Sequence, residues 1–241
     1  SGKSTTLAAM VNHINRTASK HILTQEDPVE FVHDDIRSLV SQREINVHAE
    51  NFVDALRSGL RENPDVIVIG EMRDTETMQV AVNAALTGHL VIATVHTSNA
   101  IQTIERTITM FPSDVRNQVA TDLSVALLGV VAQRLLPSAK TDEMVPAVEV
   151  LLTSSTVRKL IEDRNYLMLD DLLRQASVPG MQTFCREIFR LYQSGEVTLD
   201  DARRAADNVD EFDLLVRGME AGSDTFPQHY RDKSGQDDTA T

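Results

Sequence analysis

The chain has 241 residues, of which 41% are hydrophobic and 24% charged, a globular composition that excludes disordered, collagen-like and fibrous classes. Its 36 acidic and 23 basic residues give a formal net charge of −13, which argues against an extensive electrostatic binding surface for nucleic acid or anionic lipid. The single Cys185 cannot form an internal disulfide or a tetrahedral thiolate zinc site, and it fits a reducing compartment. The longest apolar run, residues 125–132, is far shorter than the roughly 20 residues of a membrane span.

Over residues 1–110 the hydrophobic pattern alternates between helix and strand. Residues 65–70 form a continuous apolar strand without polar alternation, which suits a parallel sheet covered by helices on both faces. We therefore predict an α/β fold with right-handed crossovers. The predicted elements are helix 4–14, strand 22–23, helix 51–61, strand 65–70, helix 75–87, strand 90–95 and a helix after Asn99.

Beyond residue 112 the pattern becomes mostly helical, with one apolar strand at 145–152. The chain thus divides into a core at 1–135, a mostly helical C-terminal subdomain at 136–208 and an acidic tail at 209–241. We expect the tail to be disordered, above all from residue 221, because the chain after residue 204 holds nine acidic residues against three basic ones. The predicted C-terminal helices are 155–163, 167–176, 182–194 and 199–206.

The first five residues match the second half of the phosphate-binding loop G-x-x-x-x-G-K-[ST], followed at once by a helix. Gly2 would let the backbone approach phosphates, Lys3 would bridge the β- and γ-phosphates, and the Ser4 hydroxyl would ligate Mg²⁺. We therefore assign nucleotide binding to Ser1, Gly2, Lys3, Ser4 and Thr5. A short Gly-Lys-Ser start is also common by chance, so this motif alone leaves a non-functional reading open.

A carboxylate follows the apolar strand at the sheet edge where open α/β folds bind ligands. Glu71 stands directly after this strand and could orient a water molecule for attack on the γ-phosphate. Many phosphate-loop enzymes place a magnesium-binding Asp just before that glutamate, but here the position is Gly70. Glu26 and Asp27, at the end of an earlier strand, are the obvious replacements; the alternative is a simple turn before proline.

Two histidines bracket the strand at 90–95. His89 and His96 lie seven positions apart, so a regular strand would point them to opposite faces and they are not expected to share a metal ion. His96, at the carboxyl end of the strand, could donate a hydrogen bond to a γ-phosphate. His89 is as readily explained by a structural polar contact.

Together and in this order, these motifs resemble the secretion ATPase superfamily, and specifically the PilT/PilU family of type IV pilus retraction ATPases. Residues 25–33 (QEDPVEFVH) resemble its Asp box, residues 56–77 its Walker B region and residues 87–97 its His box. The resemblance extends from residue 1 to about residue 208. Four ordered motifs at the family's spacing make chance a poor explanation.

The resemblance implies a RecA-like P-loop ATPase core with a helical C-terminal extension, assembled as a hexameric ring that uses ATP and Mg²⁺. It implies that Glu71 is the catalytic carboxylate, that His96 senses the γ-phosphate, and that Glu26 and Glu30 lie near metal and water. We therefore expect Glu71, Glu26, Glu30 and His96 to be catalytic, and Ser4, Glu26 and Asp27 to bind Mg²⁺.

Residues 137–143 distinguish branches of the superfamily. Assembly and secretion motors usually carry a four-cysteine zinc module there, whereas this chain has a short polar stretch. We therefore expect no zinc, and retraction rather than assembly. The DNA-transfer branch commonly shows Gly-Gly where this chain has Asp74 and Thr75, and the acidic balance favours no nucleic-acid partner.

The helix at 156–163 departs from the family pattern. PilT proteins carry AIRNLIRE there, which is needed for productive retraction, whereas this chain reads TVRKLIED and adds two acids. Coupling to the pilus could therefore differ while the nucleotide site stays intact. Spacing alone favours plain amphipathic packing, with Val157, Leu160 and Ile161 buried.

The resemblance also implies partners and a location. We expect a homohexamer, alone or mixed with a paralogue, that acts on an inner-membrane pilus platform protein from the cytoplasmic face of the bacterial inner membrane. The alternatives are an accessory ring subunit with little hydrolysis, and an assembly or secretion ATPase without the zinc module. Because the chain starts inside the phosphate loop, we expect a C-terminal motor fragment that cannot hydrolyse ATP competently alone.

Overall fold

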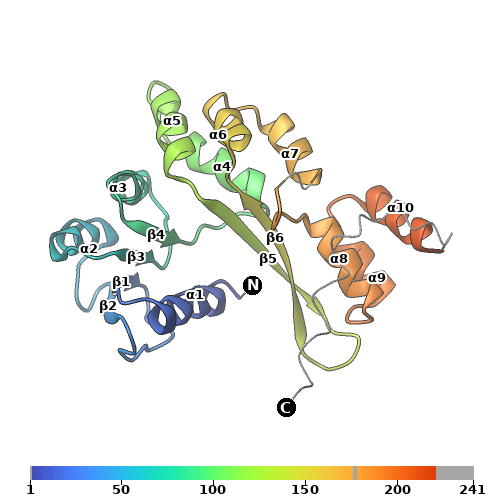
Figure 1. Ribbon diagram of the computed structural model, residues 1–241, viewed down its shortest axis with the longest axis horizontal. Helices are drawn as coiled ribbons and strands as arrows, with labels where there is room; N and C mark the ends of the chain where they lie inside the picture. The colour runs from blue at the N-terminus through green and yellow to red at the C-terminus, as the bar shows by residue number, and fades with distance from the viewer. Residues whose placement is uncertain (1, 176–177, 221–241) are drawn as a thin grey trace, which may run out of the picture.

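The computed structural model describes residues 2–175 and 178–220, which form a parallel sheet, a separate hairpin and helices packed against both (Figure 1). The strands are β1 (His21–Glu26), β2 (Leu39–Glu44), β3 (Val66–Ile69), β4 (Leu90–Ala93), β5 (Gly129–Pro137) and β6 (Met144–Leu152). The helices are α1 (Lys3–Thr17), α2 (Phe52–Gly59), the 3-10 helix η1 (Leu60–Glu62), α3 (Thr75–Leu86), α4 (Ala100–Thr109), α5 (Arg116–Ala126), α6 (Ser155–Glu162), α7 (Tyr166–Arg174), α8 (Phe184–Gln193), α9 (Leu199–Ala205) and α10 (Val209–Glu220).

The four-stranded sheet has the order β2-β1-β3-β4, and every neighbouring pair is parallel. This confirms the predicted α/β fold. Strand β3 is buried on both faces, because Val66 and Val68 pack with α1 whereas Ile67 and Ile69 pack with α2 and α3. Double burial is the physical reason for its uninterrupted apolar sequence.

Strand β2 is absent from the predicted elements. It is an edge strand of sequence LVSQRE, exposed or half-buried throughout, so its composition carries no apolar signal. It pairs in parallel with β1, with Leu39 opposite His21. Backbone hydrogen bonding to β1, rather than burial of its side chains, therefore defines this strand.

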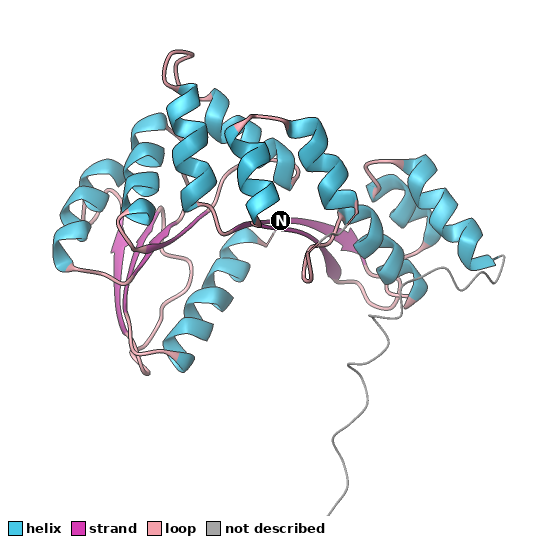
Figure 2. Cartoon of the chain, turned by 45° about the horizontal axis from the view of Figure 1, so that its top comes forward, coloured by secondary structure: helices cyan, strands magenta, loops and turns pink. Residues whose placement is uncertain are grey.

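Strands β5 and β6 form an antiparallel hairpin beyond the parallel sheet. Helices α4, α8 and α9 contact the hairpin, and helices lie over one side of it (Figure 2). The sequence predicted β6 but not β5, whose polar Gln133 and Arg134 interrupt the apolar run. The predicted boundary at residue 135 falls inside β5, so the hairpin belongs to both predicted regions.

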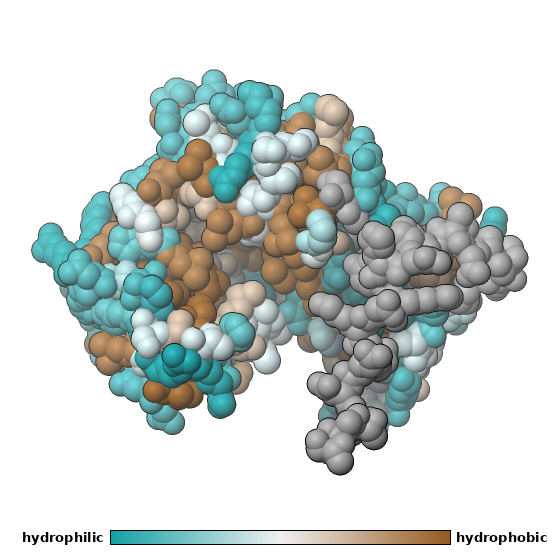
Figure 3. Space-filling model, viewed as in Figure 1, coloured by the Kyte–Doolittle hydropathy of each residue, from teal (hydrophilic) through white to brown (hydrophobic). Residues whose placement is uncertain are grey.

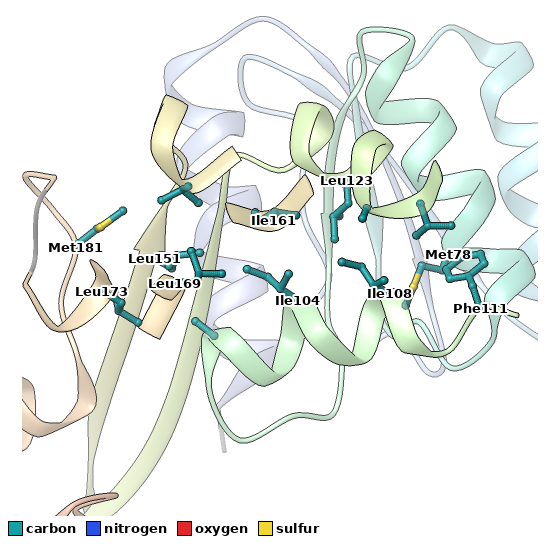
Figure 4. Close-up of a cluster of buried hydrophobic side chains, with 14 residues drawn as sticks. Met78, Ile104, Ile108, Phe111, Leu123, Leu151, Ile161, Leu169, Leu173 and Met181 are labelled. Atoms are coloured by element: carbon teal, nitrogen blue, oxygen red, sulfur yellow. The ribbon is translucent and has the colours of Figure 1, made fainter. Parts of the chain in front are cut away.

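The largest buried cluster joins the middle of the chain to its C-terminal helices (Figure 4). Ile104 and Ile108 of α4 lie among side chains contributed by α3, α5, α6, α7 and β6. This packing fixes α4 and the segment that precedes it, which carries His96. The buried members are Met78, Ala100, Ile104, Ile108, Phe111, Val119, Ala120, Leu123, Leu151, Val157, Ile161, Leu169, Leu173 and Met181.

Helix α10 corrects the predicted disorder of residues 209–220. Phe212 is fully buried and makes edge-on ring contacts with Phe189 and Tyr192, each with a centroid separation of 6.3 Å. Its acidic residues carry ion pairs, such as Glu211 with Arg174 at 2.5 Å. Disorder was predicted from the acidic composition of this segment. The helix is amphipathic, however, and its apolar face, with Phe212 and Val216 one turn apart, packs against α8. The rest of the predicted tail, 221–241, lies outside the described residues.

Helix α6, where the sequence departs from the PilT pattern, packs as an amphipathic helix. Val157 and Ile161 are fully buried, while Leu160 is half-buried. Arg158 donates from one guanidinium nitrogen to the carbonyls of Ser124 and Val125, at 2.7 and 2.5 Å, at the end of α5. A cation at a helix C-terminus satisfies carbonyls that lack partners within the helix.

Hydrophobic side chains gather toward the centre of the face in Figure 3, with hydrophilic ones around the rim. Strand β5 crosses this centre in the same view, and its Val131 and Leu135 are 45% and 38% exposed. Among the described residues, no helix combines the length and the apolarity that crossing a bilayer requires.

Candidate active site

The start of helix α1 is built to receive an anion. Gly2, its N-cap, has a φ of 78° and contributes no capping side chain, and the first turn holds no acidic residue. The starts of α2, α3 and α4 differ, since Asn51, Asp74 and Asn99 each cap them through a side chain. The first backbone amides of α1 therefore have no capping side chain within the described residues, and the helix dipole favours negative charge there.

Three of the predicted site residues meet beside this helix start. Glu71, directly after β3, has Oε1 2.7 Å from His96 Nε2. Lys3 places its Nζ 3.0 Å from Nδ1 of the same ring. The parallel strands β3 and β4 end at the same edge, so the residues that follow them converge on the start of α1.

The charge of Glu71 is set by its neighbours. Arg73 lies 2.7 Å from its Oε2, and this hydrogen bond is the main cause that lowers the pKa of the carboxyl group. Partial burial opposes the shift, and the nearby charges of His96 and Lys3 reinforce it. Glu71 is therefore an ionised hydrogen-bond acceptor at neutral pH, which suits it to orienting a water molecule.

The loop after β1 carries Glu30 to the phosphate-binding segment. Glu30 Oε1 accepts a hydrogen bond of 2.8 Å from the Ser4 hydroxyl. Two polar side chains hold the loop in place, because Gln42 bonds the backbone of residues 31 and 33, and buried Asn15 bonds the backbone of residues 34, 36 and 38. The position of Glu30 is thus supported by contacts to the residues that follow it in the loop.

The other two predicted acids occupy different surroundings. Glu26 Oε1 accepts hydrogen bonds from the Thr24 hydroxyl at 2.7 Å and the Gln42 amide at 3.1 Å, whereas Asp27 is exposed. A Cβ on Gly70 would lie 3.2 Å from the Glu26 Cα, so the close approach of β1 favours glycine at the position where many phosphate-loop enzymes have an aspartate. Among the described residues no group of three or more His, Cys, Asp or Glu could hold a metal ion by itself.

These residues line one cleft of about 290 Å³ at the carboxyl edge of the sheet. Thr5 and Gly2 lie beside the cleft rather than in its lining, with Thr5 exposed on the first turn of α1. Ser1 lies outside the described residues. The predicted residues in the lining are Lys3, Ser4, Glu26, Asp27, Glu30, Glu71 and His96.

His89 has a structural contact. Its Nδ1 lies 2.9 Å from the Ala84 carbonyl near the end of α3, and it does not line the cleft. Of the two alternatives open for His89, the structure supports the structural polar contact. His96 alone of the pair faces the candidate site.

Three residues of the site were missed by sequence reasoning. Arg73 binds Glu71, Arg106 donates to the His96 carbonyl at 2.9 Å, and Gln133 accepts a hydrogen bond from Thr6. The spacing of Arg73, two positions after Glu71, was an available signal. The other two come from α4 and β5, and no local pattern places them at this edge.

Comparison with known proteins bears on the same residues. A family model described as type II/IV secretion system protein matches residues 1–200. The chain belongs to this family. The matched range includes the phosphate-binding segment, the loop after β1 and the residues that follow β3 and β4.

The relatives include a twitching motility protein and a PilU ATPase, which confirms the resemblance to the PilT and PilU group. The chain is 44% identical over 208 residues to the twitching motility protein of Neisseria gonorrhoeae, covering 86% of this chain and 56% of that protein. It is 41% identical over 224 residues to the type IV pilus ATPase PilU of Pseudomonas aeruginosa, covering 92% and 59%. The chain thus spans less than two thirds of the length of these relatives.

A solved structure with a similar sequence has the same fold. The chain matches the crystal structure of the pilus retraction motor PilT with bound ADP at a TM-score of 0.83 and 43% identity, covering 89% of this chain and 60% of that one. This likeness confirms the RecA-like core predicted from the motifs.

Proposed function

We propose that this chain is the motor part of an ATP-hydrolysing ring that drives type IV pilus retraction. The observation that carries the proposal is the cluster of Lys3, Glu71 and His96 beside the uncapped start of α1. Phosphoryl transfer to water requires groups that bind the phosphates and a group that orients the water. The edge of the sheet offers a helix start and a cation for the first, and an ionised carboxylate beside an imidazole for the second. The ADP named with the related PilT structure supports a nucleotide ligand.

Each residue has a role in this proposal. The backbone amides of α1 and Lys3 would bind the phosphates, and Glu71 would hold the attacking water in line. The new bond forms between the water oxygen and the γ-phosphorus while the bond to the β-phosphate oxygen breaks, releasing ADP and phosphate. His96 would exchange its contact with Glu71 for the γ-phosphate and so sense its presence.

The acids near Ser4 fit a magnesium ion that is held partly by phosphates. Mg²⁺ commonly takes one or two protein oxygens and completes its shell with water and phosphate oxygens. The Ser4 hydroxyl would bind it, with Glu26, Asp27 and Glu30 available to hold its waters. Bound Mg²⁺ would neutralise charge that develops on the transferred phosphoryl group.

The ring, its partners and its location rest on the family. We propose a homohexamer, alone or mixed with a paralogue, in which neighbouring subunits supply arginines to the phosphoryl group. Closure around ATP would move one subunit against the next and turn an inner-membrane platform protein from the cytoplasmic side. The names of the relatives, a twitching motility protein and a type IV pilus ATPase, support a role in pilus-driven movement.

Retraction is favoured over assembly by the hairpin. The turn between β5 and β6, residues 138–143, is short and contains no cysteine. By the family resemblance, assembly and secretion motors usually carry a four-cysteine zinc module at this place. A deletion strain separates the two functions, since surplus surface pili without twitching would support retraction and loss of pili would contradict it.

The hydrolytic role is tested in the full natural chain with Glu71→Gln. This variant should bind ATP with normal affinity and hydrolyse it at least about 100-fold more slowly, because the amide cannot hold and polarise the water as a carboxylate does. Lys3→Ala should weaken nucleotide binding itself. Phosphate release and calorimetric titration measure the two effects.

The matched control is Glu76→Gln, because Glu76 is an exposed glutamate on α3 that pairs with Arg57 outside the cleft. Its turnover should equal that of the unmodified protein. Unchanged turnover in Glu71→Gln would refute the catalytic assignment. Unchanged affinity in Lys3→Ala would refute the phosphate-binding assignment.

A further inference from the structure

Strand β5 reaches the candidate site through one side chain. Gln133 Oε1 accepts a hydrogen bond of 2.7 Å from the Thr6 hydroxyl on the first turns of α1. Its Nε2 lies 2.7 Å from the position that a Cβ on Gly2 would occupy. The carboxamide therefore contacts Gly2 and Thr6, which lie on either side of Lys3, Ser4 and Thr5.

The end of the Gln133 side chain also packs against Gly2. The φ of 78° already disfavours a side chain, and the Gln133 amide fills the space where a Cβ would stand. Gly2, Thr6 and Gln133 thus form one packed unit. The start of α1 is thus contacted by a residue more than 120 positions away in the sequence.

The opposite face of the hairpin is fastened to the segment that follows His96. Arg134 ion-pairs with Asp207 at 2.6 Å and donates to the Ser98 carbonyl at 3.3 Å. Buried Glu149 accepts a hydrogen bond of 2.7 Å from the Ala100 amide at the start of α4. In the hairpin, Ala132 pairs with Glu149, and Arg134 lies two positions after Ala132 on the same strand. The side chains of Arg134 and Glu149 therefore project from one face of the hairpin, and that of Gln133 projects from the opposite face.

We propose that Gln133 is a positioning residue for the phosphate-binding segment, and that the β5–β6 hairpin thereby completes the nucleotide site from the C-terminal half of the chain. This inference rests on the proposed function. Gln133 touches Gly2 and Thr6, while Arg134 of β5 and Glu149 of β6 anchor the hairpin to the segment that follows His96. The hairpin thus holds two separate parts of the site at a fixed distance.

The role predicts a split between binding and chemistry. Gln133→Met, which keeps the length of the side chain but removes both polar groups, should weaken ADP binding and raise the KM for ATP by about threefold to tenfold. The kcat should stay near its original value, because Glu71 and His96 keep their contacts. Fluorescence titration with a labelled ADP and steady-state turnover, both on the full natural chain, measure the two quantities.

A double-mutant cycle with Thr6→Val tests the contact itself. Thr6→Val should weaken ADP binding by a similar factor, Thr6→Ser should retain normal affinity, and the double variant should bind no more weakly than either single variant. Leu135→Met is the control, since Leu135 lies two positions along on the same face of β5 and is 38% exposed. It should bind ADP normally.

The outcomes separate this inference from the function on which it rests. If the unmodified protein neither binds ADP nor hydrolyses ATP, the proposed function fails. If it does both and Gln133→Met leaves the ADP affinity and KM unchanged, or if the two single effects multiply in the double variant, the role of Gln133 is refuted. Should Gln133→Met not fold, the comparison of Thr6→Val with Thr6→Ser decides, and equal affinities there would overturn the role.

Discussion

Glu71 shows how neighbours decide what an acidic residue can do. Glu71 and Glu76 lie on the same strand-to-helix segment, yet Glu71 is 18% exposed between Arg73 and His96, whereas Glu76 is 61% exposed. The Arg73 hydrogen bond lowers the pKa of Glu71, so the group is ionised over the range in which enzymes usually work. An ionised Glu71 is suited to accept a hydrogen bond from a water molecule and not to donate a proton.

We expect Arg73→Gln to raise the pKa of Glu71 toward its ordinary value, because its main charge-stabilising partner is lost. If ionised Glu71 is required, the acid limb of kcat against pH should move to higher pH. The lowered pKa of Glu71 also affects the free energy of unfolding. Since its folded pKa is lowered, the contribution of ionised Glu71 to stability is present above the ordinary pKa of the group, about 4.3, and is lost as the pH falls through the folded value.

Arg57→Gln serves as the control for Arg73→Gln, since Arg57 pairs with Glu76 at the surface, outside the cleft. Its acid limb should coincide with that of the unmodified protein. An acid limb that stays in place in Arg73→Gln would contradict the assignment of this limb to Glu71. Carbon NMR of the carboxyl group would follow the same titration without turnover.

At the scale of elements, α10 shows that a charged segment can still pack. Two of its acidic residues pair with basic residues, Glu211 with Arg174 and Asp213 with Arg203. Its apolar residues contact α8, and Phe212 is fully buried there. The helix is therefore part of the C-terminal fold, and its removal should expose the cluster around Phe189.

Phe212→Ala tests this packing. Truncating a fully buried phenylalanine should lower the free energy of unfolding by about 3–5 kcal/mol. Leu214→Ala, on the exposed face of the same helix where Leu214 is 66% exposed, should change it by less than about 0.5 kcal/mol. Denaturant unfolding measures both, and equal small effects would show that α10 does not contribute to the folded core.

At the scale of the molecule, the candidate site draws on two separate sheets. The parallel sheet supplies the segments after β1, β3 and β4, while the hairpin supplies Gln133 and holds the start of α4. Helices α8 and α9 pack against the hairpin, and Cys185 is buried in the cluster that they form with it. Opening of these helices away from the hairpin would therefore expose Cys185 and loosen the support of the site at once.

Cys185 thus offers a single-residue probe of this opening. Burial is the main cause that raises the pKa of its thiol to about 12, so almost no reactive thiolate is present near pH 8. A thiol reagent should label the native chain far more slowly than the chain unfolded in denaturant. Because the sequence contains one cysteine, the colour released by an aromatic disulfide reagent reports this site alone. Equal native and unfolded rates would contradict its burial.

The sequence by itself determined the fold class, the central strands of the parallel sheet and which residues gather at its carboxyl edge. Strand β3 could be read because burial on both faces requires an unbroken apolar run, as in Val66 to Ile69. Glu71 and His96 could be placed because residues that follow parallel strands meet at one edge. Both inferences depend on local patterns that repeat wherever this geometry occurs.

Only the tertiary structure decided the partners that come from distant segments. Nothing near Gln133 in the sequence indicates Thr6, and nothing near Glu211 indicates Arg174, because each contact depends on how separate elements pack. Strand β2 was missed because backbone pairing at an edge needs no apolar side chains. Helix α10 was missed because composition records its charge, whereas its fold depends on what its apolar face meets.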